Sequence, residues 1–121
     1  MNITAKDLES FTGTESYYFL PSFPNYNYTD GIRYLAMEAQ AYWLITDIFS
    51  WQQSKSIKND SDLQYFQMWI LTVNQDRSAS LTCYRDTDQP VITQKIPFTD
   101  FPLAQVKLYL KQNVLLLPSE N

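Results

Sequence analysis

The chain has 121 residues, of which 45% are hydrophobic and 16% aromatic, so we expect one compact domain spanning residues 1–121. It contains no histidine, one cysteine and two glycines, a composition that disfavours metal sites, histidine-based triads, disulfide frameworks and glycine-rich phosphate loops. The net charge of −4 comes without any basic run, which disfavours nucleic acid and anionic membranes as partners. We therefore expect no nucleic-acid partner, no membrane association, no cofactor and no metal.

The sequence also predicts a cytoplasmic location. Residues 1–7 lack the apolar stretch of a secretion signal, and no apolar segment approaches the roughly 18 residues of a membrane span. A single cysteine, Cys83, fits a reducing compartment better than an oxidising one.

The first predicted element is a short helix over about residues 4–12. Thr4 and Asp7 have the spacing of a capping box, and Leu8 and Phe11 form an apolar stripe. Gly13 then provides a helix stop.

Strands and a tight turn are predicted next. Residues 17–20 are aromatic and favour a strand. Residues 25–29 and 32–37 flank Asp30-Gly31, a pair typical of a two-residue hairpin turn in which glycine supplies a positive φ. We therefore predict a β-hairpin centred on Asp30-Gly31.

The main helix is predicted over about residues 41–54, followed by a polar loop over residues 54–62. The helix prediction depends on six apolar residues that share one broad arc at 100° per residue. These are Ala41, Leu44, Ile45, Ile48, Phe49 and Trp51.

The second half of the chain reads as an antiparallel meander. Apolar and polar residues alternate over 66–73, 79–84, 91–98 and 106–110, and an apolar strand follows at 114–117. Turns are predicted at 74–77, 86–89, 99–102 and 111–113. The predicted class is α+β: an antiparallel sheet, made of the hairpin and the meander, covered by one main helix, with a short N-terminal helix.

Several short sequence motifs indicate a resemblance to a known family. They are Phe11-Thr12-Gly13-Thr14-Glu15, Thr29-Asp30-Gly31, Ala41-Tyr42-Trp43-Leu44, Phe66-Gln67, Trp69, Leu81-Thr82-Cys83, Phe98-Thr99-Asp100-Phe101-Pro102-Leu103 and Leu117-Pro118-Ser119-Glu120. In this order and spacing, the chain resembles a family of small bacterial proteins of unknown function that also occurs on plasmids and phages. The resemblance spans nearly the whole chain and implies one complete domain, but it implies no activity.

Little in the sequence points to catalysis. A serine or cysteine nucleophile lacks a histidine base, and Cys83 occupies an inward position of an alternating strand, where we expect it to pack in the core. Paired carboxylates are the one catalytic device that remains, and Asp30, Asp47 and Asp100 are the acids to inspect. Turn and surface roles account for all three, so we assign no catalytic residue.

The aromatic residues are the most unusual feature, with three Trp, nine Tyr and seven Phe. Tyr26 and Tyr28 share one face of the predicted hairpin and Tyr34 lies on its other strand, while Tyr42 and Trp43 lie at the edge of the helix arc. Tyrosine and tryptophan with few charges nearby are typical of protein interfaces. These five residues are our candidate binding residues, with core packing as the alternative.

The function that fits these observations best is a non-enzymatic module that binds another protein or a second copy of itself. A gene on a mobile element would favour action on a host protein. One alternative is a carboxylate-dependent hydrolase or a small-molecule-binding protein, which a pocket holding two nearby acids would support. Another is a structural subunit of a larger assembly, which a large apolar patch without a pocket would support.

Overall fold

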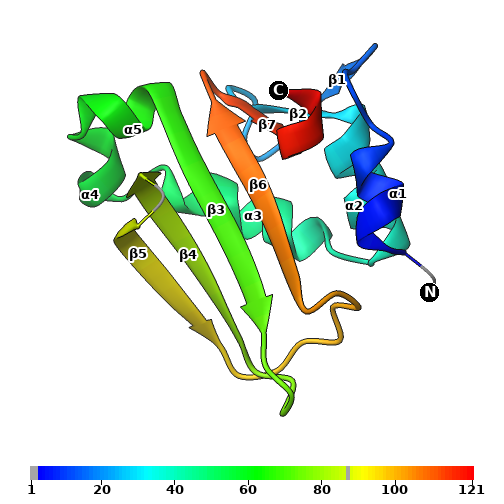
Figure 1. Cartoon of the computed structure of the whole chain (residues 1–121). Coiled ribbons are helices and arrows are strands. Elements are labelled where there is room, and N and C mark those ends of the chain that lie inside the picture. The colour runs from blue at the N-terminus through cyan, green and yellow to red at the C-terminus, as the bar shows by residue number, and fades with distance from the viewer. Residues whose placement is uncertain (1–2, 87) are drawn as a thin grey trace.

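The computed structural model describes residues 3–86 and 88–121. Met1, Asn2 and Thr87 lie outside the described residues, and with them part of the secretion-signal argument and of the predicted 86–89 turn. Over the described residues the chain forms a seven-stranded sheet with several short helices, so the α+β class is confirmed (Figure 1). None of the described helices is long and apolar enough to cross a membrane.

The elements follow one another along the chain without long connections. The helices are α1 (Ala5–Glu9), α2 (Asp30–Glu38), α3 (Tyr42–Trp51), α4 (Lys55–Lys58), α5 (Ser61–Tyr65) and the 3₁₀-helix η1 (Pro118–Glu120). The strands are β1 (Tyr17–Tyr18), β2 (Asn27–Thr29), β3 (Phe66–Val73), β4 (Ala79–Asp86), β5 (Gln89–Ile96), β6 (Gln105–Lys111) and β7 (Val114–Leu116).

The described strands are ordered β1-β2-β7-β6-β3-β4-β5 across the sheet. Neighbours pair antiparallel, except that β2 pairs parallel with β7. The antiparallel pairing predicted from residue 66 onward is confirmed, and β3, β4 and β5 form a meander. The prediction of one continuous meander in a purely antiparallel sheet is wrong, because β6 returns across the sheet to pair with β3 instead of β5 and β7 pairs parallel with β2. The alternation along β3 and β4 places Trp69, Leu71 and Leu81 in the core, together with Cys83, which is fully buried as expected.

The N-terminal helix keeps its predicted start but is shorter than expected. Thr4 and Asp7 form the predicted capping box, with Asp7 N–H donating to Thr4 Oγ1 at 3.1 Å. The helix ends at Glu9 with Ser10 as its C-cap, so Gly13 does not terminate it.

The predicted hairpin at Asp30-Gly31 is wrong, because this segment begins helix α2. Thr29 is the N-cap and its Oγ1 accepts the Ile32 N–H at 3.3 Å. Gly31 does not have a positive φ, so no primed turn forms here. The helix is stable because Ile32, Leu35 and Ala36 fall on one buried face at helical spacing, with Ala39 continuing that face.

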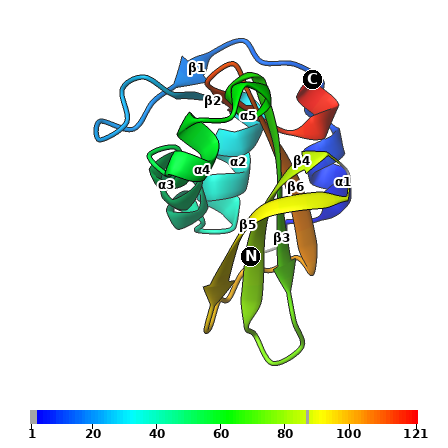
Figure 2. The same cartoon turned by 90° about the vertical axis from the view of Figure 1, so that its left-hand side faces the viewer.

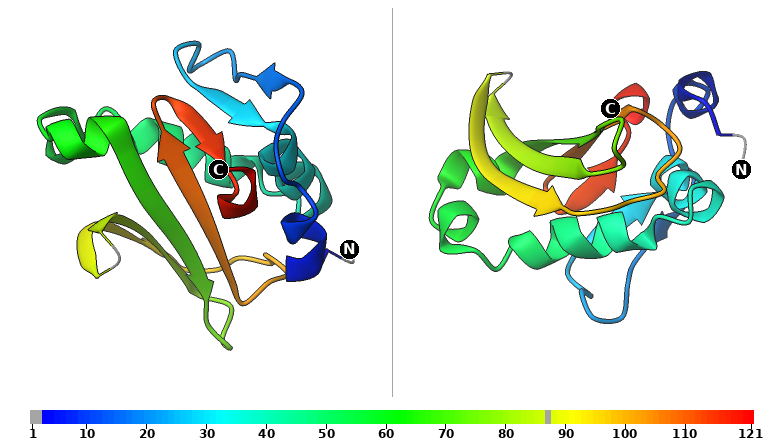
Figure 3. Two further views of the ribbon diagram at one scale, coloured as in Figure 1. Left: turned by 45° about the horizontal axis from the view of Figure 1, so that its top comes forward. Right: turned by 90° about the horizontal axis from the view of Figure 1, so that it is seen from below.

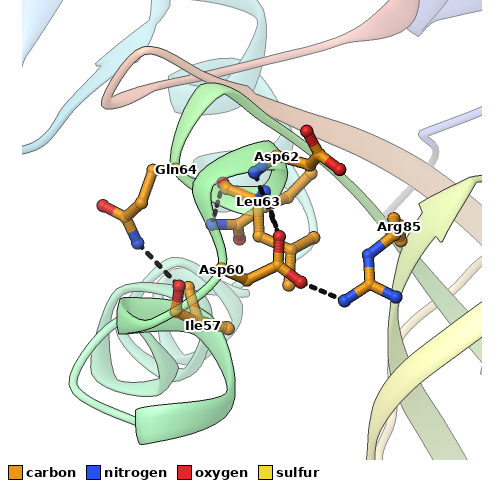
Figure 4. A network of polar contacts seen from close by, with 7 residues as sticks. Ile57, Asp60, Asp62, Leu63, Gln64 and Arg85 are labelled. Carbon is orange, nitrogen blue, oxygen red and sulfur yellow. Dashed lines mark hydrogen bonds and ion pairs between the residues drawn. The ribbon is translucent and has the colours of Figure 1, made fainter.

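The polar loop predicted at residues 54–62 is also wrong, because it contains α4 and the start of α5. Ser54 caps α4, and the Asp60 carboxylate caps α5 by accepting the N–H groups of Asp62 and Leu63 (Figure 4). Asp60 also forms an ion pair with Arg85 at the end of β4. Buried Ile57 and Leu63 attach the two short helices to the core.

The helices are distributed unequally over the two faces of the sheet. Helices α2, α3 and α4 lie on one side, and α1 and η1 lie toward the other (Figure 2). The predicted main helix is α3, which shares its covering role with α2 (Figure 3). A buried side-chain network joins α3 to β3: Gln67 Oε1 accepts from Gln52 Nε2 at 2.9 Å and from Trp69 Nε1 at 2.8 Å.

Candidate functional site

The candidate site is an open groove of about 770 Å³ between the loop of residues 10–15 and the exposed face of α2. Five residues of α2 line it, at the spacing of one helix face: Asp30, Arg33, Tyr34, Met37 and Glu38. Its volume lies in the range of ligand sites, although the groove is open rather than enclosed.

The wall formed by the loop is held in place by Asp30. The Asp30 carboxylate accepts the Glu15 N–H at 2.9 Å and the Tyr18 hydroxyl at 2.8 Å, while its own N–H donates to Thr14 Oγ1 at 2.9 Å. These donors favour the charged carboxylate and lower the pKa of Asp30 below its ordinary value, with the Glu15 N–H as the largest cause. The loop therefore has a fixed position against the first turn of α2.

The C-terminal segment secures the same turn of α2 from the other side. The Glu120 carboxylate accepts the Thr29 hydroxyl at 2.6 Å, the Gly31 N–H at 3.0 Å and the Leu117 N–H at 3.0 Å. A carboxylate at a helix N-terminus is favourable, because it meets free N–H groups and the positive end of the helix dipole. A Cβ on residue 31 would lie 2.6 Å from Glu120 Oε1. Glycine is therefore required at this position by close packing, and not by the predicted turn.

The groove has an apolar surface as well as a polar one. The rings of Phe11 and Tyr34 are in contact, with centroids 5.1 Å apart. Met37 is 48% exposed at the same face of α2, an unusual exposure for a flexible apolar side chain. A Cβ on Gly13 would meet nothing within 4 Å, so the loop backbone faces open space at that point.

The charges around the groove are predominantly negative. Glu15, Asp30 and Glu38 line it, against the single cation Arg33, whose guanidinium lies 5.0 Å from the Tyr18 ring centroid. Burial raises the pKa of Tyr34, and the negative charges of Asp7 and Glu38 raise it further. The groove thus combines aromatic rings with an excess of carboxylates. Within the described residues, no group of Cys, Asp and Glu side chains is placed to hold a metal ion.

Comparison with known families gives one match. Residues 2–121 match the model of a family of unknown function, DUF6876. The chain belongs to this family. No curated protein and no solved structure matches the chain.

Three of the short motifs noted in the sequence converge on the first turn of α2. Residues 11–15 form the loop wall and residues 29–31 start the helix. Residues 117–120 include Glu120, whose carboxylate accepts hydrogen bonds at the N-terminus of that helix. Hydrogen bonds connect all three segments although up to 91 positions separate their partners. The groove is therefore assembled from segments that lie far apart in the sequence.

The five predicted binding residues do not form one surface. Tyr34 lines the groove. Tyr28 is only 5% exposed, and Tyr26 stacks on buried Phe49 at 5.3 Å, so both contribute to packing. Tyr42 is 40% exposed near Tyr28, and Trp43 lines a separate shallow hollow with Phe98.

The three acids singled out from the sequence are also on separate elements. Asp30 supports the groove, Asp47 of α3 accepts a hydrogen bond from Gln94 Nε2 at 3.1 Å, and Asp100 borders the hollow of Trp43. Arg33, Met37 and Glu38 were missed, because the hairpin prediction hid the helical spacing of α2. Residues 30, 33, 34, 37 and 38 share a helix face, and that periodicity is the signal that could have found these three. Glu15 lies in the loop before β1, where no periodic pattern could have found it.

Proposed function

We propose that this DUF6876 protein is a binding module for another protein and that its groove receives a basic segment of that partner. The observation that carries the proposal is the combination of the Phe11 and Tyr34 rings with three carboxylates in one open groove. Among the described residues that line the groove, Arg33 is the one cation, and it is engaged at the Tyr18 ring. Asp30 already accepts hydrogen bonds from Glu15 and Tyr18, so Glu15 and Glu38 are the carboxylates offered to a ligand.

The chemistry of the groove suits a lysine or arginine side chain. Such a cation gains from an aromatic ring face and from charge-assisted hydrogen bonds to carboxylates. Glu15 and Glu38 are exposed on opposite walls, where they can contact an approaching cation without a burial cost. Met37 offers an adaptable apolar contact for the stem of the bound side chain.

The proposed setting is the bacterial cytoplasm, with a host protein as the partner of a chain carried by a plasmid or phage. A free, fully buried Cys83 and the absence of a membrane-spanning helix among the described residues are compatible with that setting.

A second candidate function is recognition of a small cationic molecule, with or without carboxylate-dependent hydrolysis. It is favoured by the presence of Glu15, Asp30 and Glu38 around a groove of ligand size. Against hydrolysis, the carboxylate of Asp30 accepts two structural hydrogen bonds and its pKa is lowered, which suits a general acid poorly.

The proposal is tested by affinity capture from the native host with three tagged baits, read by mass spectrometry. The baits are the wild type, Glu15→Lys/Glu38→Lys in the groove, and Asp88→Lys/Asp100→Lys outside it. Both double variants replace exposed acids and carry the same net charge. A partner recovered with the wild type and the control, and lost with the groove variant, is the expected result.

Two outcomes would contradict the proposal. One is a partner retained equally by all three baits, which would place the interface elsewhere. The other is a stable homodimer in light scattering whose dimerisation the groove variant abolishes, since that would assign the groove to self-association. If no partner is captured and an amine binds the groove, recognition of a small cationic molecule replaces protein binding as the proposed function.

A further inference from the structure

On the second face of the sheet no described helix covers β3, β4 and β5, and α1 and η1 lie only at its border (Figure 3). Helix α3 packs behind β3 and β6, while the opposite face of β3, β4 and β5 is open (Figure 1). The β4–β5 hairpin bends toward this open face, at register shifts next to Tyr84, and α1 and η1 flank it on the other side (Figure 3). The open face is therefore curved and bordered on two sides.

An apolar stripe runs along the middle of the open face. Phe66, Met68 and Ile70 alternate along β3 with the residues that point into the core. Met68 is in register with Tyr84 on β4 and with Tyr109 on β6, and the rings of Phe66 and Tyr109 are 4.9 Å apart. Ile70, Tyr84 and both of those rings are only half-buried, so they leave an apolar surface in contact with solvent.

Lysines flank the stripe on both sides. Lys107 and Lys111 lie on β6 in register with Ile70 and Phe66, and Lys95 lies on β5 in register with Ser80. Asp86, at the far end of β4 beyond the register shift next to Tyr84, is the one acid in the described strands. Glu9 of α1 and Lys107 line the same hollow at the edge of this face. In a chain of net charge −4, this face is thus locally positive.

We propose that the open face binds an acidic amphipathic helix of a partner protein. An uncovered apolar sheet face is completed by packing a helix on it, as a further layer of the same architecture. The lysine-bearing strands β6 and β5 are three strand spacings apart, roughly 14 Å, which exceeds the ~10–12 Å width of a helix. Carboxylates along both flanks of the helix then face Lys95 on one side and Lys107 and Lys111 on the other.

Single-stranded nucleic acid is the competing occupant, because aromatic rings on a sheet can stack bases. Three lysines release few counterions, and the remainder of the chain is acidic, so the electrostatic contribution to nucleic-acid affinity is small. Ile70, at the centre of the stripe, is aliphatic and half-buried, and it suits a leucine-rich helix face better than a base. Met68 is only 7% exposed and adds little contact surface. We therefore assign the face to a helix.

The test is a titration of the isotope-labelled full chain, followed by backbone amide shifts. The probe is a helical peptide of about 18 residues, whose length matches the eight-residue β3, with a leucine stripe flanked by glutamates. The comparison probes are the same peptide with lysine in place of glutamate, and an oligothymidylate. The variants are Lys95→Glu/Lys107→Glu/Lys111→Glu, the matched control Lys6→Glu/Lys55→Glu/Lys58→Glu, and Ile70→Thr.

We expect saturable shifts from the acidic peptide, confined to β3–β6, and affinity weakened about tenfold or more by the open-face lysine variant. Ile70→Thr weakens binding as well, and the control triple variant binds like the wild type, with all variants folded by amide dispersion. The proposal is overturned if the acidic peptide gives no saturable shifts, if both triple variants weaken it equally, or if only oligothymidylate binds this face. Because the groove and the open face are mapped separately, failure here leaves the groove proposal standing.

Discussion

The two glycines of the chain differ sharply in how closely neighbouring atoms pack around them. Gly31 is packed against the Glu120 carboxylate and Leu117, whereas Gly13 faces open space at the groove. Gly31→Ala places a methyl group where Glu120 accepts its hydrogen bonds, and we expect a loss of about 1–3 kcal/mol in the free energy of unfolding. Urea denaturation measures this loss directly.

Gly13→Ala serves as the matched control for that prediction. Its added methyl meets no neighbour, so we expect a change within about 0.5 kcal/mol. An equal effect of the two substitutions would contradict the role assigned to the packing of Glu120 against Gly31.

The protonation of Asp30 makes the free energy of unfolding of the whole fold depend on pH. Because its pKa is lowered in the folded state, it contributes stability above its ordinary pKa of 3.8, and this contribution is lost as the pH falls through the folded value. We expect Asp30→Asn to reduce stability at neutral pH and to flatten the decline below about pH 4. Tyr18→Phe removes one of the two donors and should shift the profile in the same direction.

The measurement is the urea midpoint followed from pH 7 down to about pH 2.5. Asp60 and Asp76 also have lowered pKa values, so the wild-type decline does not disappear entirely in the variant. An Asp30→Asn profile parallel to that of the wild type at every pH would refute the role of this carboxylate.

At the scale of elements, the attachment of α3 to β3 depends on buried polar groups. Gln67 Oε1 is the acceptor for both Trp69 Nε1 and Gln52 Nε2. Gln67→Ala leaves those donors buried without this partner and opens a cavity, so we expect a loss of about 2–4 kcal/mol. Gln52→Ala keeps the Trp69 bond and should cost less. Denaturation of both variants checks the order, and a Gln52→Ala loss as large as that of Gln67→Ala would contradict it.

The elements also show how far the sequence predicts this fold. Period-two alternation gave β3 correctly from Phe66 to Val73, because each inward side chain along it is apolar or, at Gln67, paired. The α2 prediction failed because Asp30-Gly31 is a strong local turn signal, whereas the helix depends on contacts with Glu120 and the core that local patterns do not contain. The polar loop predicted at residues 54–62 was wrong for a similar reason, since buried Ile57 and Leu63 attach two short helices to the core.

At the scale of the molecule, the two surfaces have opposite character. The groove beside α2 is acidic and aromatic, while the open face of the sheet is apolar and flanked by lysines. The two proposed partners therefore carry opposite charges, and we expect each to be steered to its own surface. Tyr34 was the one predicted binding residue that the groove includes, because composition identifies aromatic residues while only the fold determines which of them gather.

The most direct test of the central claim is an amide-shift titration of the full chain with a lysine- and arginine-rich peptide. We predict saturable shifts confined to residues 10–15 and 30–38, lost in Glu15→Lys/Glu38→Lys and retained in Asp88→Lys/Asp100→Lys. Shifts absent, spread over the whole surface, or unchanged in the groove variant would contradict the claim that this groove recognises a basic segment.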